Sequence, residues 1–268
     1  MDMDSKPRIS RTTGRMLLVL LVLGVFGAWF AFDPGFRSLR SSLFGNGAEM
    51  LQDEFDRRVH DYVMAHPEII VQSVNQLEAR ARAAEQTEAQ KVLQARADEV
   101  FRDPDSPVGG NPNGDVTVVE FFDYNCPYCR QVAPVVTKAE ENDPQLRIVY
   151  KEFPILGPNS TFAAKAALAA DRQGKYVAFH RALYQVRGTV DQGKTLDVAA
   201  SVGLDLGRLK ADMDDPKIRA SIEKNLGLAQ ALRINGTPGF VIGTQILRGA
   251  TDLNTLQTWI REVRDHRQ

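Results

Sequence analysis

The sequence predicts an α/β unit with an all-helical subdomain inserted in its middle, and three observations lead to that fold class. A β-rich run from Val116 is followed by a helical pattern and then by a second β-rich run, Leu146 to Phe153. A long helical region with short breaks extends from Ser160 to about Ile234. The chain closes with a short strand, Gly239 to Ile242, a hairpin partner and an amphipathic helix. The predicted order is therefore β-α-β, a helical insertion, and β-β-α.

The bulk composition argues against several classes of protein. With 268 residues, the chain can bury a full core and hold more than one structural unit. Its net charge of −1 and pI near 6.4 do not suggest a nucleic-acid binder. Two cysteines are too few for a disulfide-stapled fold, and zinc needs about four ligands. No histidine lies near the cysteines in the sequence; the four are His60, His66, His180 and His266. We therefore expect no metal and no other cofactor.

An uncharged apolar segment, residues 16–32, follows a basic N-terminus, residues 1–15. As a helix it reaches roughly 25 Å, the short end of what spans a bilayer. The basic flank predicts a cytoplasmic N-terminus and an exported remainder. We favour an uncleaved inner-membrane anchor over a cleaved signal peptide, because Trp29 and Phe30 crowd the region where cleavage needs small residues. With an anchor or with a cleaved signal peptide, the rest of the chain is predicted to lie in a bacterial periplasm.

A connector, residues 33–47, leads to a predicted helical stalk, residues 48–101. Pro67 interrupts the stalk, and Glu68 follows as a first-turn acid. Its apolar residues recur at helical spacings: Leu51, Phe55, Val59, Tyr62, Val63, Ile69, Ile70, Val74 and Leu77. Such a stripe must be buried somewhere, so we expect self-association through the stalk. Packing of the stripe against the rest of the chain is the alternative.

Residues 102–114 contain the runs Asp-Pro-Asp-Ser-Pro and Gly-Gly-Asn-Pro-Asn-Gly. Proline, glycine and asparagine in such clusters are typical of loops and turns. We therefore expect a linker and a domain boundary here.

The stretch from Val116 to Cys129 carries the candidate chemistry. A predicted buried strand delivers Cys126-Pro127-Tyr128-Cys129 to the start of a helix, with Pro127 at the first helical position. At a helix N-terminus, free N–H groups and the helix dipole favour a thiolate, so we expect Cys126 to be a partly exposed nucleophile. Cys129, one turn later, is placed to attack Cys126 and release a bound substrate. An incidental cysteine pair is the alternative.

The run Val-Val-Glu-Phe-Phe-Asp-Tyr-Asn-Cys-Pro-Tyr-Cys, the helical insertion and Gly-Thr-Pro-Gly-Phe-Val-Ile together resemble the DsbA family of thioredoxin-fold oxidoreductases. Cys-Pro-Tyr-Cys also occurs in glutaredoxins, which are short and lack the insertion. The run Arg-Val-His-Asp-Tyr-Val-Met-Ala-His-Pro-Glu-Ile-Ile resembles the N-terminal oligomerisation region of the ScsC-like branch. The resemblance implies a thioredoxin-like domain over residues 115–268, with the insertion at about 158–234.

The resemblance also implies roles for further residues. Pro238 is expected to form a cis peptide bond with Thr237 opposite the cysteines, and Thr237 to tune the Cys126 sulfur; an ordinary turn is the alternative. Glu120 is expected to lie beneath the cysteines as the proton acceptor for Cys129, with a pKa raised by burial. An edge-strand glutamate facing water is the alternative for Glu120. We interpret Asp123 as a solvated loop acid.

The resulting functional hypothesis is an envelope protein thiol–disulfide oxidoreductase with a redox-active Cys126–Cys129 disulfide. A stalk that assembles several sites favours an isomerase or reductase, while a DsbA-like dithiol oxidase is the alternative. Pro127 and Tyr128 tune the couple, and Tyr128 replaces the histidine of the prototype oxidase, which leaves the potential open. Copper(I) handling by the two thiolates is a further alternative. The predicted partners are protein substrates, a membrane redox partner that recycles the cysteines, and further copies of this chain through residues 48–101.

Overall fold

The structure, a computed structural model, describes residues 46–266, with side chains from residue 51 onward. It divides into two compact units at Glu78 and Ala79. The predicted basic N-terminus and apolar segment (1–15 and 16–32), and most of the connector, lie outside the described residues. Among the helices that the structure describes, none has the length and apolar character needed to cross a membrane.

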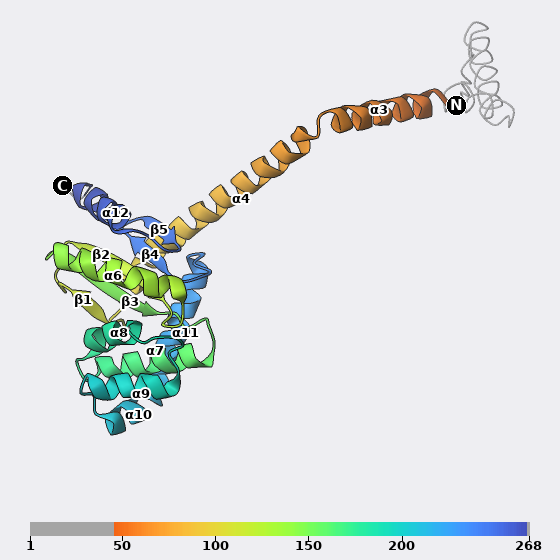
Figure 1. The fold of residues 1–268 in the computed structure, drawn as a ribbon. Coiled ribbons are helices and arrows are strands. Elements are labelled where there is room, and N and C mark those ends of the chain that lie inside the picture. Colours follow the sequence, from red (N-terminus) through yellow and green to blue (C-terminus); the bar gives the residue numbers. More distant parts are fainter. Residues whose placement is uncertain (1–45, 267–268) are drawn as a thin grey trace, which may run out of the picture. The chain divides into compact units, whose positions relative to one another are not determined.

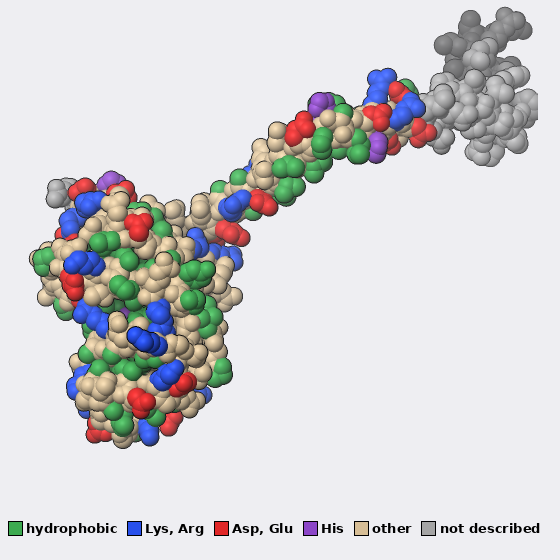
Figure 2. Space-filling view, in the orientation of Figure 1, with side chains coloured by type: hydrophobic (Ala, Val, Ile, Leu, Met, Phe, Trp, Pro, Cys, Tyr) green, Lys and Arg blue, Asp and Glu red, His purple; other side chains and the backbone are tan. Residues whose placement is uncertain are grey.

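The first unit contains α3 (Asn46–Ala65) and the beginning of α4 (Glu68–Ala95). The break at Pro67 and the first-turn Glu68 are as predicted. Hydrophobic side chains follow these helices in Figure 2. The exposed large ones are Leu51, Phe55, Val59, Tyr62, Met64, Ile70, Val71, Val74 and Leu77. The predicted stripe is therefore present, and all its side chains except those of Val63 and Ile69 are exposed in the single chain.

The second unit is built on a five-stranded sheet of order β1-β3-β2-β4-β5 (Figure 1). The strands are β1 (Val108–Gly110), β2 (Val116–Phe122), β3 (Leu146–Glu152), β4 (Gly239–Ile242) and β5 (Gln245–Arg248). β2 and β3 are parallel, and the other neighbours are antiparallel. β2 is central and buried on both faces, which explains its almost unbroken apolar sequence.

Helices cover both faces of this sheet. Between β2 and β3 lies α6 (Pro127–Asn142), and α12 (Leu253–Asp265) closes the chain. The insertion between β3 and β4 consists of α7 (Pro158–Asp171), α8 (Tyr176–Tyr184), α9 (Gln192–Ser201), α10 (Leu206–Met213) and α11 (Pro216–Ala231). Helices α7 to α10 are grouped beside the sheet in Figure 1. The predicted helical insertion is thus confirmed.

The core has two parts, one on each face of the sheet. The first includes Val118, Phe122 and Tyr150 together with α6, α12 and the helices α7 to α10. The second includes Val119 and Val149 together with the end of α11 and the end of α4. Because strand side chains alternate, neighbouring residues of β2 and β3 contribute to different parts of the core.

The predicted linker over residues 102–114 is wrong, because this segment contains β1 and belongs to the core of the second unit. β1 pairs with β3, and Val108 lies opposite Val149. Gly109 is required by the close approach of Tyr150, since a Cβ there would lie 2.9 Å from the tyrosine hydroxyl oxygen. The residues before β1, from Ala79 through α5 (Ala97–Phe101), also belong to this unit. The second unit therefore begins well before residue 115, where the sequence analysis placed its start.

Candidate active site

The two cysteines lie at the start of α6, directly after the loop that follows β2. Cys126 is the N-cap residue with extended backbone angles, and Pro127 is the first helical residue, as predicted. Both cysteines are free thiols. Cys129 is fully buried, whereas Tyr128 between them is 61% exposed. Cys126 is only 4% exposed, so the prediction of a partly exposed sulfur is wrong for the single chain.

The segment before β4 covers Cys126. β2 and β4 are antiparallel, with Phe121 opposite Gly239, so the residues preceding β4 lie beside the end of β2. The Thr237–Pro238 peptide bond is cis, as expected. The Cys126 Sγ donates a hydrogen bond to the Thr237 carbonyl oxygen at 3.2 Å. Thr237 therefore contacts the Cys126 sulfur through its backbone.

Burial strongly raises the pKa of the Cys129 thiol. A backbone hydrogen bond from Asp123 opposes this shift, and the charges of Glu120 and Cys126 add to it. A hydrogen bond from the Thr237 side chain also lowers the pKa of Cys129. Thr237 therefore acts on both sulfurs, whereas the sequence predicted contact with Cys126 alone.

Glu120 lies on the central strand β2, where it is 1% exposed. The alternative of an edge-strand glutamate facing water is wrong, because β2 is flanked by β3 and β4. Within the described part of the chain, its Oε1 atom has no hydrogen-bond partner. Burial alone raises the pKa of Glu120 to about 8. A carboxyl group with that pKa next to a buried thiol can both accept and return a proton near neutral pH.

Asp123 is buried, so its interpretation as a solvated loop acid is wrong. Its carboxylate accepts hydrogen bonds from the backbone N–H groups of Asn125 at 2.8 Å and Leu156 at 2.9 Å. Its carbonyl oxygen accepts from the Cys126 N–H at 3.0 Å. An aspartate that binds the N–H two residues later is a common turn pattern, and this signal was available in the sequence. Asp123 therefore shapes the loop that presents Cys126.

Asn125 ties the same loop to the helical insertion. Its side-chain amide donates to Ser160 Oγ and to the Val190 carbonyl, each at 3.2 Å. Its oxygen accepts from the Val190 N–H at 2.8 Å. The position of Cys126 thus depends on contacts with residues distant in the sequence.

The sequence analysis missed a buried polar cluster beside the site. Glu152 Oε1 accepts hydrogen bonds from the hydroxyl groups of Tyr124 at 3.0 Å and Tyr176 at 2.6 Å. His180 Nδ1 lies 3.1 Å from the Tyr124 hydroxyl oxygen. Burial raises the pKa of Glu152 well above its ordinary value, and it lowers the pKa of His180 to about 3. Burial therefore disfavours the charged form of both side chains.

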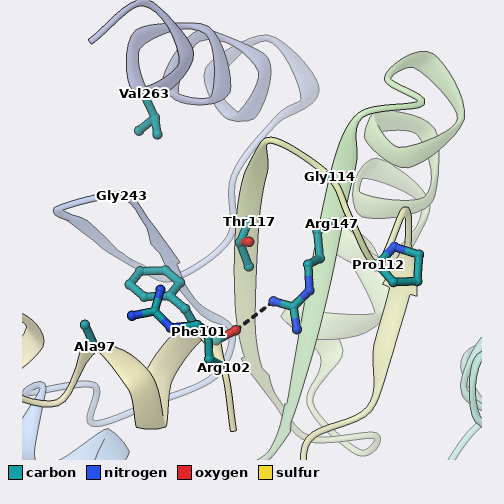
Figure 3. Close-up of a pocket in the computed structure, with 9 residues that line it drawn as sticks. All are labelled: Ala97, Phe101, Arg102, Pro112, Gly114, Thr117, Arg147, Gly243 and Val263. Carbon is teal, nitrogen blue, oxygen red and sulfur yellow. Dashed lines mark hydrogen bonds between the residues drawn. The ribbon is translucent and has the colours of Figure 1, made fainter. Parts of the chain in front are cut away.

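A cavity of about 550 Å³ lies at the opposite end of β2 (Figure 3). Its wall includes Thr117 near the start of β2 and Arg147 on β3, whereas the cysteines follow the end of β2. Arg147 Nη1 donates to the Phe101 carbonyl oxygen at 2.6 Å, which anchors α5 to the sheet. No cysteine, histidine or acid lines this cavity. In the described residues, no three His, Cys, Asp or Glu side chains are grouped as a metal ion would require.

Comparison with known proteins agrees with this geometry. The family described as DSBA-like thioredoxin domain matches residues 117–261. The chain belongs to this family. A second family, described as the copper resistance protein ScsC N-terminal domain, matches residues 52–84. The recognition of a DsbA-like protein of the ScsC-like branch from the sequence is thus confirmed, and with it the thioredoxin-like fold.

Three solved structures illustrate the relationship of this DsbA-like chain to known proteins. A thioredoxin-like oxidoreductase from Silicibacter pomeroyi DSS-3 is 49% identical with a TM-score of 0.62, and the match covers 63% of this chain and 97% of that one. Proteus mirabilis ScsC in a transitional conformation is 30% identical with a TM-score of 0.60, covering 79% and 94%. A periplasmic thioredoxin-like protein from Salmonella enterica serovar Typhimurium is 30% identical with a TM-score of 0.57, covering 62% and 94%.

Some curated relatives are much longer than this chain. The Na(+)/H(+) antiporter NhaA 1 of Salinispora arenicola is 31% identical over 157 residues, which is 58% of this chain. The match spans only 24% of the antiporter, about a quarter of its length.

Proposed function

We propose that this protein exchanges disulfides with protein substrates through Cys126 and Cys129. The observation that carries the proposal is the position of the Cys126 sulfur: it lies at the N-terminus of α6 and within hydrogen-bond distance of the Thr237 carbonyl, next to Pro238. Backbone N–H groups at a helix N-terminus stabilise a thiolate, which is the nucleophile in thiol–disulfide exchange. Family membership supports the same chemistry.

In the proposed mechanism, the Cys126 thiolate attacks one sulfur of a substrate disulfide, and the other substrate sulfur leaves as a thiolate. The Cys129 thiol then gives its proton to Glu120, whose pKa of about 8 leaves a fraction of this carboxyl group ionised near neutral pH. The Cys129 thiolate attacks Cys126, which forms the Cys126–Cys129 disulfide and releases the second substrate sulfur with its electron pair. The substrate is reduced by two electrons, and the protein is oxidised by two. Backbone groups around Thr237 and Pro238 pair with an extended substrate peptide.

Within this reaction class, we propose that the protein acts as a disulfide isomerase or reductase rather than as an oxidase. The exposed apolar stripe on α3 and α4 and the match to the ScsC N-terminal domain support self-association through residues 48–101. Several sites on one assembly can bind different parts of a misfolded substrate. We also propose a periplasmic location with residues 16–32 as an inner-membrane anchor, and a membrane redox partner that reduces the cysteines. The similar thioredoxin-like protein from Salmonella enterica serovar Typhimurium is periplasmic, which supports this location.

The test compares isomerisation of scrambled ribonuclease with oxidation of reduced ribonuclease. The intact chain is compared with a Phe55→Glu/Val74→Glu variant, which places charges in the stripe, and with Gln76→Glu as a matched control on exposed α4 surface. We expect the double variant to lose self-association by light scattering and to lose isomerase activity, while the control keeps both. Cys126→Ser should abolish both activities. Oxidase activity alone, insensitive to the stripe substitutions, would overturn the isomerase assignment.

A further inference from the structure

A cleft of about 500 Å³ separates α6 from α8 on the sheet face that carries the cysteines. Its wall includes Arg130, Ala133 and Thr137 from α6, and His180 and Tyr184 from α8. Two arginines connect the helices around it. Arg130 Nη1 donates to the Tyr184 carbonyl oxygen at 3.1 Å, and Arg181 Nη2 lies 2.8 Å from Glu140 Oε2. These contacts therefore fix the positions of the two helices that line the cleft.

Two buried polar atoms close to Cys129 lack partners within the part of the chain that the structure describes. They are the Tyr184 hydroxyl oxygen and Glu120 Oε1. Burial raises the pKa of Tyr184 well above its ordinary value, and the charges of Cys129 and Glu120 raise it further. The Tyr184 hydroxyl therefore lies within electrostatic reach of both groups. Buried hydroxyl and carboxyl groups are nearly always hydrogen-bonded, so two such atoms that interact electrostatically call for an explanation.

Tyr184 differs in this respect from the other tyrosines nearby. The hydroxyl groups of Tyr124 and Tyr176 both donate to Glu152. His180 also contacts Tyr124. The Tyr184 hydroxyl has no hydrogen-bond partner among the residues described here. Tyr184 is also the only one of these three tyrosines that lines the cleft. Its ring centroid lies 6.2 Å from that of Phe122, which is on the same face of β2 as Glu120.

We infer that the Tyr184 hydroxyl relays a proton between Glu120 and solvent in the cleft between α6 and α8. This inference rests on the proposed function, because Glu120 holds the proton only after Cys129 has released it. Glu120 returns the proton through water to the Tyr184 oxygen, and the Tyr184 O–H proton passes to water in the cleft. Glu120 is then ionised again, Tyr184 is neutral, and one proton has left the protein for each disulfide formed.

The test separates the two steps of the reaction in the full chain. Reduced protein is mixed with glutathione disulfide and quenched with acid, and mass spectrometry follows the mixed disulfide. Its formation reports attack by Cys126, and its decay reports attack by Cys129. Positioned proton transfer contributes about 10²- to 10⁴-fold, and a relay carries part of it, so we expect Tyr184→Phe to slow the decay about tenfold. Formation should be unchanged, and the solvent deuterium isotope effect on decay should change.

Two variants serve as references. Ser221→Ala removes another buried hydroxyl without a partner, on α11, and should leave both steps unchanged. Glu120→Gln should slow the decay at least as much as Tyr184→Phe. Removing an unpaired buried hydroxyl does not cost a hydrogen bond, so Tyr184→Phe should fold normally. If it does not fold, Ala133→Met, which narrows the cleft and leaves Tyr184 in place, should slow the decay instead.

Several outcomes would overturn the relay. These are an unchanged decay rate in Tyr184→Phe, equal slowing of both steps, or the same slowing in Ser221→Ala. If Tyr184→Phe does not fold, an unchanged decay rate in Ala133→Met would also overturn the relay. Failure of the proposed function looks different, because the unsubstituted protein would then form no mixed disulfide at all.

Discussion

The two faces of the central sheet bury ionisable groups in opposite ways. On the face toward α6 and α8, no cation among the described residues contacts the buried Glu120 or Glu152, and burial raises the pKa of both. On the other face, the buried Lys151 ammonium has an ionised partner: its Nζ lies 3.0 Å from Asp103 Oδ2. Lys151 and Glu152 are neighbours on β3, and strand alternation alone sends them to different environments.

On the sheet face that carries Lys151, the buried charged side chains are paired with one another. Lys151 Nζ also donates to Ser106 Oγ and to the Glu99 carbonyl oxygen, each at 2.7 Å. Burial would raise the pKa of Asp103, but the hydrogen bond from Lys224 and the charge of Lys151 outweigh it and hold that pKa below its ordinary value. These contacts fasten the segment before β1 to the sheet. A fully paired cluster has a fixed protonation state and acts as a structural contact.

The Glu120 face is arranged to change its protonation. A buried acid without a cation costs little while neutral and much when ionised. Such a group is a poor structural contact but a useful proton acceptor, because its pKa lies near the working pH. The difference between the faces therefore separates the residues that hold the unit together from those that exchange protons.

The largest predicted effect concerns Glu120 and is a change in the pH dependence of stability. Its pKa is about 8 in the folded protein against an ordinary value of 4.5. Between those values the unfolded chain has lost a proton that the folded protein keeps, so stability falls as the pH rises through this window. The loss is complete above pH 8 and amounts to about 5 kcal/mol. Glu120→Gln should lack this component.

Urea unfolding of both reduced proteins at pH 5 and pH 9 measures the effect. The unsubstituted protein should lose about 4 kcal/mol more than Glu120→Gln between these pH values, because part of the loss has already occurred at pH 5. Other titrating groups cancel in the comparison, because both proteins contain them. Parallel pH profiles would contradict the assignment of Glu120 as a buried neutral acid.

The next prediction concerns the paired face. Asp103→Ala leaves the Lys151 ammonium buried beside Ser106 without its anion, which should destabilise the protein by about 3–5 kcal/mol at pH 7. Urea unfolding provides the measurement, and Asp105→Ala, an exposed neighbour, is the control. The double variant Asp103→Leu/Lys151→Met should regain most of the loss, because the charge that remains, on Lys224, is partly exposed to water. A loss below about 1 kcal/mol in Asp103→Ala would remove the distinction between the faces.

A smaller difference in stability is expected between variants of two tyrosines on α8. Tyr176→Phe removes a 2.6 Å hydrogen bond to Glu152 and should destabilise the protein by about 1–2 kcal/mol. Tyr184→Phe removes a hydroxyl that has no protein partner in the described structure and should be nearly neutral for stability. Thermal unfolding of both variants at pH 7 makes the comparison. Equal destabilisation would mean that the Tyr184 hydroxyl already has a bond of the same strength.

The parts of the fold that local patterns determine were predictable from the sequence. β2 and the start of α6 follow from an apolar run and from Pro127 after Cys126. The burial of Glu120 follows from its place inside that run. β1 was missed because Val108-Gly109-Gly110 has almost no strand propensity of its own and depends on pairing with β3.

The polar contacts of the site were missed because they join distant parts of the chain. Tyr124 and Glu152 are 28 residues apart, and Tyr124 and His180 are 56 apart. Neither Glu152 nor His180 stands in a recognisable motif, so no local signal indicates that they meet. The burial of Asp123 depends in the same way on the backbone of Leu156.

The smallest predicted effect concerns the second cation of the paired face. Lys224 Nζ lies 2.8 Å from Asp103 Oδ1, but its side chain is 35% exposed, whereas the Lys151 side chain is fully buried. Water and salt screen an exposed ion pair, so Lys224→Met should cost only about 0.5–1 kcal/mol, and less at high salt. Urea unfolding at low and high ionic strength measures it, with Arg219→Met on the same helix as the control. A loss as large as that of Asp103→Ala would mean that Asp103 depends on Lys224 rather than on the buried Lys151. The small loss expected for Lys224→Met means that the main stabilising ion pair of this face joins Lys151 on β3 to Asp103 in the segment before β1.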